Sequence, residues 1–488
     1  MRVVESGPLE RSQGKAKRVM DLRLQGVDRM NQAIDAVGLP AAEVAAWRSA
    51  DPTRTVDFTA DRERFGTFWR LTEQLLARLP ARPARGPAEA EAAATIHRAA
   101  RAARDRFLER HVEAVYTAVT GGLSRFVRIE DLVLRAAETV PGLVPTRAQL
   151  AHEAGRKLPE KEGLEIDQSI LAARILGHSR CGTHLCHAML LPRPESEAAL
   201  ATLTARGVAD LGPVRIERHG LAVHLLTTNP RYLNAEDQTT IAAMETGVDV
   251  ATLDPGTSIA VMRGQPVTHA KHAGRRIFGS GINLMHLYHG GIPFIWYLQR
   301  ELGFVHKCFR GVATAQEMPD DVSGTGIEKP WIAAVEGWAI GGHCQTLLTM
   351  DTVLATRDSF LTLPARKEGI IPGAANLRLP RFTGDRLARQ LIQAERRLEC
   401  DSLEGRLICD EVVAADGMDA AIERTVTMMS NAGAVGAIGN RRALRVGAEP
   451  LDVFRRYLAV YAREQAECHF SEALVRNLEQ NWGAARRS

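Results

Sequence analysis

The sequence contains no apolar stretch long enough to cross a membrane. Neither the opening segment MRVVESGPLERSQGKAKRVM nor any later window holds the run of about 18 or more apolar residues that a spanning helix needs, and none has the pattern of a secretory signal. We therefore expect a cytoplasmic protein without a membrane partner.

A strong excess of one charge is also missing. The chain has 62 Lys and Arg residues against 58 Asp and Glu residues, so its formal net charge is only +4. A nucleic-acid-binding protein usually carries a marked basic patch, so we expect no nucleic-acid partner. One basic run, at Lys15, Lys17 and Arg18, lies within residues 1–19, which we interpret as a flexible tail.

Disulfide and nucleotide-binding patterns are absent as well. The seven cysteines are odd in number and scattered along the chain, which is typical of reduced thiols rather than of a disulfide framework. The sequence has no Walker pattern, and it has no Gly-x-Gly-x-x-Gly that opens a helix after a strand. A loop that cradles nucleotide phosphates is therefore not indicated.

The segment HSRCGTHLCHAML is the most tempting metal site, because it holds His178, Cys181, His184, Cys186 and His187. Structural zinc is usually bound by two separated pairs of ligands, and no second pair follows here. The HVE triplet at 111–113 has the local spacing of a non-haem iron site but lacks an evident third ligand. We interpret these side chains as packing and polar contacts, and we expect no metal.

Hydrophobic periodicity predicts a helical first part of the chain. From about Met20 to Pro192, apolar residues recur at spacings of three and four in a background rich in Ala, Leu, Arg and Glu. The segment ARLPARPARGPAEA, residues 77–90, contains prolines that cannot continue a helix, so it predicts a linker. We expect a helical N-terminal domain over residues 20–210.

Strand patterns follow this helical part. The segment VRIERHGLAVHLLTTN predicts a hairpin around Gly220. The short apolar runs SIAVMRG, PWIAAVE and DTVLAT then alternate with helical patterns such as EDQTTIAAMETGVDVATL and CQTLLTM. This alternation predicts an α/β core, which we place at residues 211–425.

The last part of the chain, residues 426–488, returns to helical patterns. Four large side chains fall on one helical face: Phe454, Tyr457, Leu458 and Tyr461. We expect this face to pack against a domain of the same chain or against a neighbouring subunit.

Two glycine-containing turns are candidates for chemistry. They are IFGSGINL, residues 277–284, and the turn around Gly341 and Gly342 in WAIGGHCQ. Glycines allow a tight turn and a close approach of a ligand to backbone N–H groups. At a helix N-terminus, such N–H groups lack intrahelical acceptors and favour negative charge. Two of them that converge from separate loops would form an oxyanion hole.

Four ordered motifs over residues 214–420 resemble the crotonase (enoyl-CoA hydratase/isomerase) superfamily. They are LTTNPRYLNAED, FGSGINL, AIGGHCQ and EGIIPGAANLRLPR. The resemblance implies a crotonase-like spiral of strand-helix repeats, here preceded by an all-helical N-terminal domain and followed by C-terminal helices. It also implies that the backbone N–H groups of Ile282 and Gly342 form the oxyanion hole, while His343 and Cys344 pack.

The sequence departs from the hydratases of this superfamily at both acid/base positions. Gln345 and Ala365 stand where those enzymes have glutamates, so the addition of water to a double bond lacks its general acid and base. We therefore expect no hydratase activity. Glu368 lies three residues beyond Ala365, and we leave open whether it makes a structural polar contact or serves the reaction.

A narrower resemblance covers most of the chain. The long helical part, together with HLCHAMLLPRPE, RYLNAEDQTTIAAMET, RELG and EGIIPGAANLRLPRF, resembles the cofactor-independent dioxygenases that act on 3,5-dihydroxyphenylacetyl-CoA in glycopeptide antibiotic pathways. The resemblance implies that O2 and the aryl-acetyl-CoA are converted to 3,5-dihydroxyphenylglyoxylate and free coenzyme A. It implies no metal, flavin or haem, and it implies a homotrimer or homohexamer.

The same resemblance assigns three groups of residues. Side chains that recognise the phenolic hydroxyls would be Glu236, Arg300 and Gln345. Side chains that line a small apolar space for O2 would be Leu284, Ala365 and Ile370. Arginines that contact the coenzyme A phosphates would be Arg231, Arg275 and Arg276.

Several alternatives stay open. Without the resemblance, Glu236 would be read as a helix-start residue, and Arg300 with Glu301 as a surface pair. Another crotonase-type reaction that needs an enolate, such as thioester hydrolysis or decarboxylation, would release product without consuming O2. A non-catalytic acyl-CoA-binding scaffold would bind the thioester and turn nothing over. The acceptor of the α-proton is not identifiable from the sequence.

Overall fold

The computed structural model describes residues 32–316, 319, 326–430 and 434–486 of the chain. The predicted flexible tail, residues 1–19, lies outside this description. The chain divides into two compact units, Met1–Arg110 and His111–Ser488. Each unit is described by itself.

The described part of the first unit consists of helices. They are α2 (Ala41–Ser49), α3 (Phe58–Leu76) and the beginning of α4 (Pro87–Thr120). Three buried aromatic rings join α3 to α4: Phe65 and Trp69 of α3 both lie against Phe107 of α4, with ring centroids 5.3 and 5.7 Å apart. Such ring pairs add to the free energy gained by burying their area.

The predicted linker between two helices is confirmed, but it is shorter than expected. Residues 77–86 connect α3 to α4 and include the short 3-10 helix η1 (Arg82–Ala84). The last four residues of the predicted linker, 87–90, belong instead to the first turn of α4. Pro87 is tolerated there because the first helical residue has no intrahelical acceptor for an N–H group.

The second unit begins with further helices, as the periodicity predicted. They are α5 (Ile129–Thr139), α6 (Arg147–Ala154), α7 (Glu165–Gly177), α8 (Ser179–Leu190) and α9 (Ser196–Arg206). The histidines of α8 make polar contacts within the protein. The imidazole of His184 lies between the hydroxyl of Tyr116, at 2.8 Å, and the carbonyl of Leu123, at 3.1 Å. His187 contacts the carbonyl oxygen of Thr314 at 3.0 Å.

A seven-stranded sheet follows α9, in the order β1-β2-β3-β4-β5-β7-β10. The hairpin prediction is confirmed, since β2 and β3 pair antiparallel on either side of Gly220, which has a φ of +58°. The strands from β3 to β10 pair in parallel. The bounds are β1 Val208–Asp210, β2 Val214–His219, β3 Ala222–Thr227, β4 Ile259–Gly264, β5 Trp331–Val335, β7 Thr352–Thr356 and β10 Glu411–Val413.

Helices cover both faces of this sheet. Helix α10 (Ile241–Leu253) packs on β2 and β3, where Gly247 lies so close to Val214 and Leu225 that a Cβ atom would meet them at 3.0 and 3.1 Å. Helix α17 (Met418–Met429) packs against a cluster of side chains that includes Ala222 and Val261. Residues an odd number of positions apart on a strand face opposite sides of the sheet. Leu225 lies under α10 and Ala222 lies under α17, so the two helices cover opposite faces.

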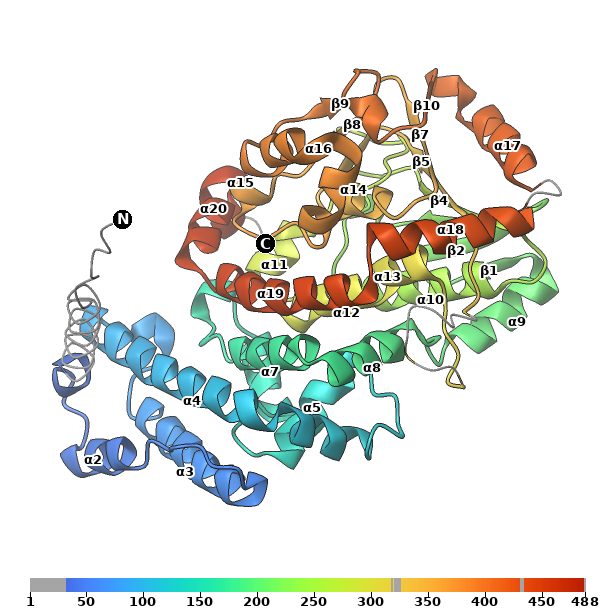
Figure 1. The fold of residues 1–488 in the computed structure, drawn as a ribbon. Coiled ribbons are helices and arrows are strands. Elements are labelled where there is room, and N and C mark those ends of the chain that lie inside the picture. The colour runs from blue at the N-terminus through green and yellow to red at the C-terminus, as the bar shows by residue number, and fades with distance from the viewer. Residues whose placement is uncertain (1–31, 317–318, 320–325, 431–433, 487–488) are drawn as a thin grey trace, which may run out of the picture. The chain divides into compact units, whose positions relative to one another are not determined.

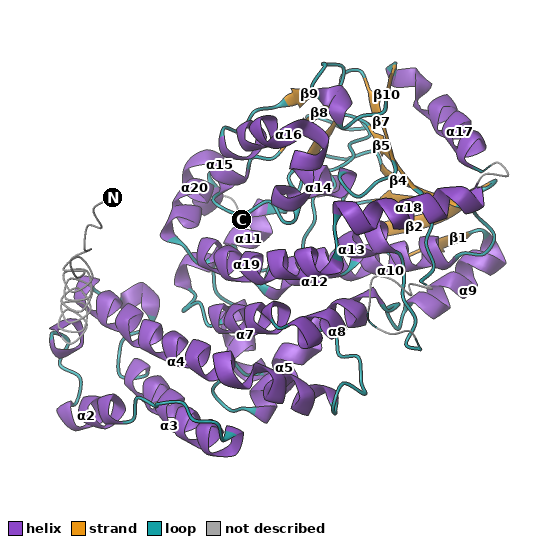
Figure 2. Cartoon of the chain, viewed as in Figure 1, coloured by secondary structure: helices purple, strands orange, loops and turns teal. Residues whose placement is uncertain are grey.

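The strands, orange in Figure 2, lie among helices that precede and follow them in the chain. A second, three-stranded sheet has the order β6-β8-β9. Its strands are β6 (Trp338–Ile340), β8 (Phe360–Thr362) and β9 (Leu398–Glu399). Strand β6 pairs in parallel with β8. The turn at Gly341 and Gly342 follows directly after β6.

The remaining helices of the second unit connect and cover these sheets. Their bounds are α11 Leu284–Tyr288, α12 Ile295–Leu302, α13 Phe304–Arg310, α14 Gly342–Leu347, α15 Ala365–Glu368, α16 Ala375–Gln393, α18 Ala434–Ala448, α19 Leu451–His469 and α20 Glu472–Trp482. Short 3-10 helices in this unit are η2 (Leu158–Glu160), η3 (Pro230–Tyr232), η4 (Gly405–Leu407), η5 (Ala415–Gly417) and η6 (Ala484–Arg486).

The predicted aromatic face of the last part packs within the same unit. Helix α19 lies along α7 (Figure 1), and Phe454, Leu458 and Tyr461 are buried. The ring of Phe454 stacks on His306 of α13 with centroids 4.1 Å apart. The first of the two predicted alternatives, packing against a domain of the same chain, is therefore confirmed.

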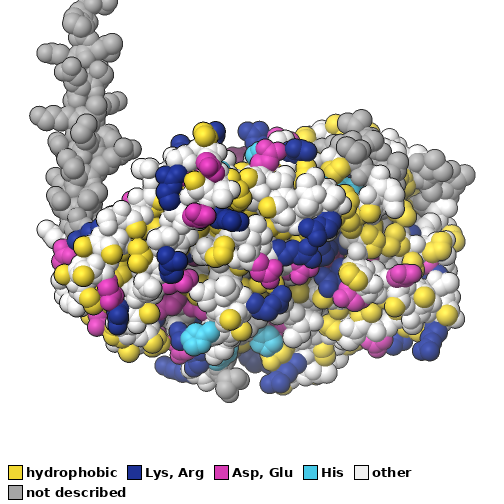
Figure 3. Space-filling model, turned by 90° about the horizontal axis from the view of Figure 1, so that it is seen from below, with side chains coloured by type: hydrophobic (Ala, Val, Ile, Leu, Met, Phe, Trp, Pro, Cys, Tyr) yellow, Lys and Arg dark blue, Asp and Glu magenta, His cyan; other side chains and the backbone are white. Residues whose placement is uncertain are grey.

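The surface carries mixed charge. On the face that Figure 3 shows, Lys and Arg side chains are interspersed with Asp and Glu side chains, in agreement with the near balance of charges in the sequence. Among the described residues, no helix is both long enough and apolar enough to span a bilayer.

Candidate active site

A pocket in the second unit brings together residues that are far apart in the sequence. It holds about 440 Å³ of empty space, counting its open mouth. Its walls come from the turns at Ile282 and at Gly341–Gly342, from helix α12, from the segment between Leu363 and Gly373, and from helix α19. The predicted sites at 282, 342, 236, 300 and 345 all line this pocket.

The two glycine turns lie side by side at the pocket wall. Gly279 pairs with Ala339 in a parallel bridge, and the N–H of Ile340 donates to the carbonyl oxygen of Gly279 at 3.0 Å. A Cβ atom on Gly281 would lie 3.4 Å from the amide nitrogen of Gly342. Gly281 and Gly341 have φ angles of +75° and +53°, which favour glycine.

The backbone pairing leaves both predicted N–H groups available to the pocket. In the bridge between Glu236 and Ile282, the bonds are made by the Gly281 carbonyl and by the Asn283 N–H. The Ile282 N–H takes no part in that pairing. Gly342 is the first residue of α14, so its N–H has no acceptor within the helix. An oxyanion hole needs N–H groups that are not used in backbone pairing, and the assignment of these two stays a prediction.

His343 does more than pack. Its Nδ1 atom accepts a hydrogen bond from the N–H of Gly281 at 3.1 Å, so the second turn holds the first in place. Burial lowers the pKa of His343, and the Glu236 carboxylate only partly offsets this effect. The imidazole is therefore neutral near pH 7, and its Nε2 atom, 3.7 Å from a Glu236 oxygen, carries the proton. Burial also raises the pKa of Cys344 to about 12, in agreement with a packing role.

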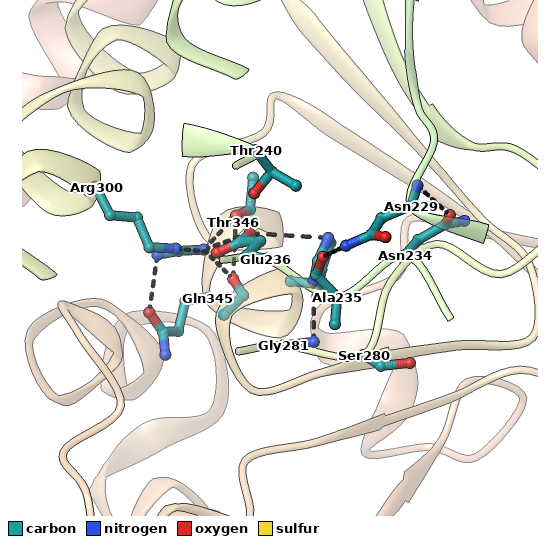
Figure 4. Close-up of polar contacts among 12 residues, drawn as sticks. Asn229, Asn234, Ala235, Glu236, Thr240, Ser280, Gly281, Arg300, Gln345 and Thr346 are labelled. Carbon is teal, nitrogen blue, oxygen red and sulfur yellow. Dashed lines mark hydrogen bonds and ion pairs between the residues drawn. The ribbon is translucent and has the colours of Figure 1, made fainter. Parts of the chain in front are cut away.

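Arg300 of α12 is the centre of a buried polar cluster, which Figure 4 shows. Its guanidinium binds both carboxylate oxygens of Glu236 and also donates to the Gln345 side-chain oxygen at 3.1 Å. It further donates to the carbonyl oxygen of Gly342 at 2.6 Å and to the hydroxyl of Thr346 at 3.1 Å. Of the three residues predicted to recognise phenolic hydroxyls, Arg300 thus contacts both of the others directly.

This cluster is charged. Burial alone would raise the pKa of Glu236, but the positive charge of Arg300 holds it below its usual value. Burial alone would lower the pKa of Arg300, but the carboxylates of Glu236 and Glu301 raise it. Both side chains of the pair therefore stay ionised although both are buried.

The loop before Glu236 is positioned by two asparagines, visible in Figure 4. Asn229 donates from its side chain to the carbonyl of Ala235 at 2.8 Å, and Asn234 donates to the carbonyl of Ile277 at 2.8 Å. Asn234 has a φ of +56°, a conformation that asparagine tolerates better than most residues. The alternative interpretation of Glu236 as a helix-start residue is wrong, because α10 begins only at Ile241.

Glu301 is a member of the cluster that the sequence reasoning missed. It accepts from Arg300 at 2.6 Å and from the backbone N–H of Ala374 at 3.1 Å. Glu301 and Arg300 are only 1% and 3% exposed, so the alternative of a surface pair is wrong. A signal was present: in PFIWYLQRELGF the short polar run Gln299–Glu301 lies between two apolar runs, as expected for charges in a buried segment.

The C-terminal helix α19 also contributes to the pocket, which the sequence did not predict. The Tyr457 hydroxyl donates to the carbonyl of Gly373, and the Gln465 side chain accepts from the N–H of Ile371 at 2.8 Å. Tyr461 lines the pocket itself. A Cβ atom on Gly373 would lie 2.3 Å from oxygens of Glu301 and Gln345, so this loop fits the cluster only with glycine.

Comparison with known proteins identifies the family. Residues 322–439 match the family model for enoyl-CoA hydratase/isomerase. Over 416 residues the sequence is 44% identical to a (3,5-dihydroxyphenyl)acetyl-CoA 1,2-dioxygenase from Amycolatopsis orientalis, covering 85% of this chain and 94% of that protein. The chain belongs to the same family as this dioxygenase, within the crotonase superfamily. The predicted fold class, a crotonase core with helices before and after it, is confirmed.

Solved structures of the crotonase superfamily are more distant in sequence. An enoyl-CoA hydratase/isomerase from Xanthobacter autotrophicus Py2 is 21% identical, with a TM-score of 0.47 over 57% of this chain and 96% of that one. An enoyl-CoA hydratase from Bacillus halodurans is 15% identical, with a TM-score of 0.46 over 55% of this chain and 100% of that one.

The residues predicted to form an O2 space in this crotonase core are only partly brought together. Ala365, the first residue of α15, and Ile370 both line the pocket. Leu284 is the first residue of α11, is half-buried, and does not belong to the pocket wall. The assignment of an O2 space stays a prediction.

The three arginines predicted to contact coenzyme A do not belong to the pocket wall. Arg231 is exposed, with its guanidinium 5.4 Å from the ring centre of Tyr232. Arg275 is exposed and 3.7 Å from Asp358. Arg276 is half-buried and donates to the carbonyl of Gly264 at 3.2 Å. Two of them are thus accessible to a phosphate, and their assignment stays a prediction.

Glu368 lines the pocket beside Ala365 and is 7% exposed. Within residues 32–316, 319, 326–430 and 434–486, no group donates a hydrogen bond to its carboxyl or forms an ion pair with it. The alternative of a structural polar contact therefore finds no support. Burial, together with the charge of Glu395, raises the pKa of Glu368 to about 8.

No group of three or more His, Cys, Asp or Glu side chains in the described part of the chain is arranged to hold a metal ion.

Proposed function

We propose that this protein is a dioxygenase that converts 3,5-dihydroxyphenylacetyl-CoA and O2 to 3,5-dihydroxyphenylglyoxylate and free coenzyme A, without a metal, flavin or haem. The proposal rests on the family and on one observation of the pocket. A buried cluster of Glu236, Arg300 and Gln345 lies directly beside the turn at Gly342, so polar groups suited to a dihydroxyphenyl ring lie next to a candidate oxyanion hole.

In the proposed complex, the thioester oxygen lies between the N–H groups of Ile282 and Gly342. Negative charge that develops on this oxygen is stabilised by both donors, and removing one such donor from an enzyme typically costs about 3 kcal/mol of transition-state stabilisation. The ring then extends toward the cluster of Arg300. The Gln345 oxygen is occupied by Arg300, so its NH2 group is left to donate to a phenolic oxygen, while Glu236 accepts from a phenolic hydroxyl.

The reaction would draw its electrons from the substrate. Loss of an α-proton gives a carbanion spread over the thioester oxygen and the ring, and this carbanion transfers an electron to O2. Recombination forms a C–O bond, and the resulting peroxide attacks the thioester carbonyl and expels coenzyme A. Loss of the second α-hydrogen as a proton, with cleavage of the O–O bond, leaves one oxygen atom as the ketone on the α-carbon and the other in the new carboxylate. The overall balance is thioester plus O2 to glyoxylate, free thiol and one proton.

The residues at the two hydratase positions support this proposal over water addition. Gln345 has no titrating proton, and Ala365 has no polar group. A hydratase pair cannot form from these side chains. Gln345 also avoids a further negative charge next to Glu301, since both side chains approach the same point beside Gly373.

We propose further that the protein acts in the cytoplasm as a homotrimer or homohexamer, with no nucleic-acid or membrane partner, in the biosynthesis of a glycopeptide antibiotic. The seven cysteines, all of them unpaired, support a reducing compartment. Light scattering coupled to size-exclusion chromatography would measure the mass, and a mass of one 53.4 kDa chain would contradict the oligomer.

The experiment that tests the activity follows two products at once. Protein treated with a chelator and dialysed is mixed with 3,5-dihydroxyphenylacetyl-CoA, and O2 uptake and free thiol are recorded together, with an anaerobic control. We expect one O2 consumed for each thiol released and no thiol release without O2. Thiol release that continues without O2 would make the protein a thioesterase, and a lack of both signals would favour a binding role.

A further inference from the structure

Three carboxyl groups line the pocket, and two of them are paired with one shared cation. Glu236 and Glu301 both bind the guanidinium of Arg300, at opposite edges of its fork. Glu301 also accepts the Ala374 N–H. A carboxylate that is stabilised in its charged form by an arginine is a weak base, because protonation has to break the ion pair.

The third carboxyl group, that of Glu368, differs in every one of these respects. It is the last residue of α15, is more than nine-tenths buried, and lines the pocket. In the part of the chain that the structure describes, no cation or hydrogen-bond donor contacts its carboxyl group. An unpaired buried carboxyl group costs stability, so its place in the pocket calls for a partner that arrives with the substrate.

The backbone around Glu368 is well fixed. Gly369 ends α15 with a φ of +90°. The loop that follows is held by α19 through Gln465 and Tyr457, as described for Ile371 and Gly373. The carboxyl group is therefore attached to a rigid wall of the pocket, which is what a positioned acid or base needs.

The charges around Glu368 keep it close to its point of titration. Burial and the carboxylate of Glu395, which follows α16, raise its pKa to about 8, and Lys367 opposes them. Lys367 is exposed and lies over the ring of Trp482. The other titratable groups that face the pocket are Tyr297 of α12, Tyr461 of α19 and the cluster of Glu236, Arg300 and Glu301. A base that titrates near the working pH is the most efficient kind.

We propose that Glu368, in its ionised form, accepts the proton that leaves the α-carbon of the bound aryl-acetyl thioester. This inference rests on the proposed function. In the step, the C–H bond breaks and an O–H bond forms on Glu368. The electron pair of the C–H bond moves into the enolate, whose oxygen lies at the N–H groups of Ile282 and Gly342. No oxidant takes part, so the step runs without O2.

The test uses this independence from O2. The full-length protein is incubated anaerobically in D2O with 3,5-dihydroxyphenylacetyl-CoA, and the recovered thioester is analysed by mass spectrometry for α-deuterium. We expect the wild type to exchange the α-hydrogens. We expect Glu368→Gln to slow exchange by about 100-fold or more, the usual contribution of a general base, while the dissociation constant of the thioester changes only a few-fold.

A second variant tests whether the pH dependence of exchange reports the ionisation of Glu368. Glu395→Gln removes a negative charge that disfavours ionised Glu368, so the rise of the exchange rate with pH should move to lower pH. Glu395 does not line the pocket, so exchange itself should persist in this variant. A residue with a structural role only would not show this shift. The variant also carries the test if Glu368→Gln fails to fold.

The outcomes separate this inference from the proposed function. Wild-type O2 uptake and thiol release, combined with rapid exchange in Glu368→Gln, would overturn the role of Glu368 and leave the dioxygenase intact. An unshifted pH profile in Glu395→Gln would also overturn it. A wild-type protein that binds the thioester but neither exchanges nor consumes O2 would overturn the proposed function itself.

Discussion

Two buried clusters of charge in the second unit have nearly the same composition. In one, Arg300 binds Glu236 and Glu301. In the other, Lys307 binds Glu245 and Asp249 of α10, at 2.8 and 2.7 Å. Helices α12 and α13, which carry the two cations, follow each other directly in the chain. Burial and ion pairing alone therefore cannot mark a functional site.

The two clusters differ in their surroundings: one is enclosed by other protein groups, and the other borders the pocket. The Lys307 cluster is closed by protein: Asp249 also accepts the N–H of Arg193 and the hydroxyl of Ser196, and Glu245 binds Arg128. The Arg300 cluster lies at the pocket wall, beside the Gly342 turn. We infer that the Lys307 cluster joins helices and that the Arg300 cluster serves a ligand. Each prediction below breaks or sharpens this difference.

The largest effect is expected for Arg300→Met. It leaves Glu236 and Glu301 buried without their cation, which typically costs about 3–5 kcal/mol of folding stability, and it also removes the centre of the ring-recognition cluster. We expect turnover to be lost even under conditions where the variant is folded. Chemical denaturation and O2 uptake measure the two effects, and a folded variant with normal turnover would contradict the assignment.

Lys307→Met is the matched change in the closed cluster. It should cost a similar amount of stability, about 3–5 kcal/mol, because it leaves Asp249 buried without its cation and removes one of the two cations that bind Glu245, which keeps Arg128. Below its melting temperature, however, the variant should keep the Michaelis constant and the turnover number of the wild type within a few-fold. A selective loss of turnover in this variant would show that the two clusters are not separate in function.

Gln345→Glu sharpens the comparison within the pocket. The new carboxylate would compete with Glu236 and Glu301 for Arg300 and would remove the NH2 group that we assign to a phenolic oxygen. We expect turnover to fall by about tenfold to a hundredfold, the cost of one or two hydrogen bonds to a charged group. Unchanged dioxygenase turnover would mean that Gln345 does not contact the ring.

The smallest effect is expected for His343. His343→Phe removes the acceptor for the Gly281 N–H, so the first turn loses its tether and turnover should fall by up to about tenfold. His343→Asn places an oxygen near the position of Nδ1 and should restore most of the rate. If Phe and Asn behave alike, the hydrogen bond has no role in positioning the oxyanion hole.

The sequence predicted those parts of the molecule that depend on local pattern. The hairpin around Gly220 and the strands β4, β5 and β7 follow from alternating or continuous apolar runs, and all are present. The glycine turns at 281 and 341 were located because their φ angles require glycine. The end of the linker before Pro87 was misplaced, because a proline is equally compatible with a loop and with the first turn of a helix.

Contacts between distant segments could not be predicted in the same way. The binding of Glu301 to the Ala374 N–H and the contacts of α19 with the loop at 371–373 depend on how helices pack, which periodicity does not encode. His343 was assigned to packing because a histidine on a buried helix gives no sign of its hydrogen-bond partner. The positions of Glu236, Arg300 and Gln345 came from the family resemblance rather than from local pattern.

The central claim is that both atoms of O2 enter the product, and isotope labelling tests it most directly. The protein is supplied with 3,5-dihydroxyphenylacetyl-CoA under 18O2, and the mass of the acid product is measured soon after quenching, before the ketone oxygen exchanges with water. The account predicts two labelled oxygen atoms in 3,5-dihydroxyphenylglyoxylate, one of them in its carboxylate. An acid product whose carboxylate oxygen comes from water would contradict it and would indicate thioester hydrolysis.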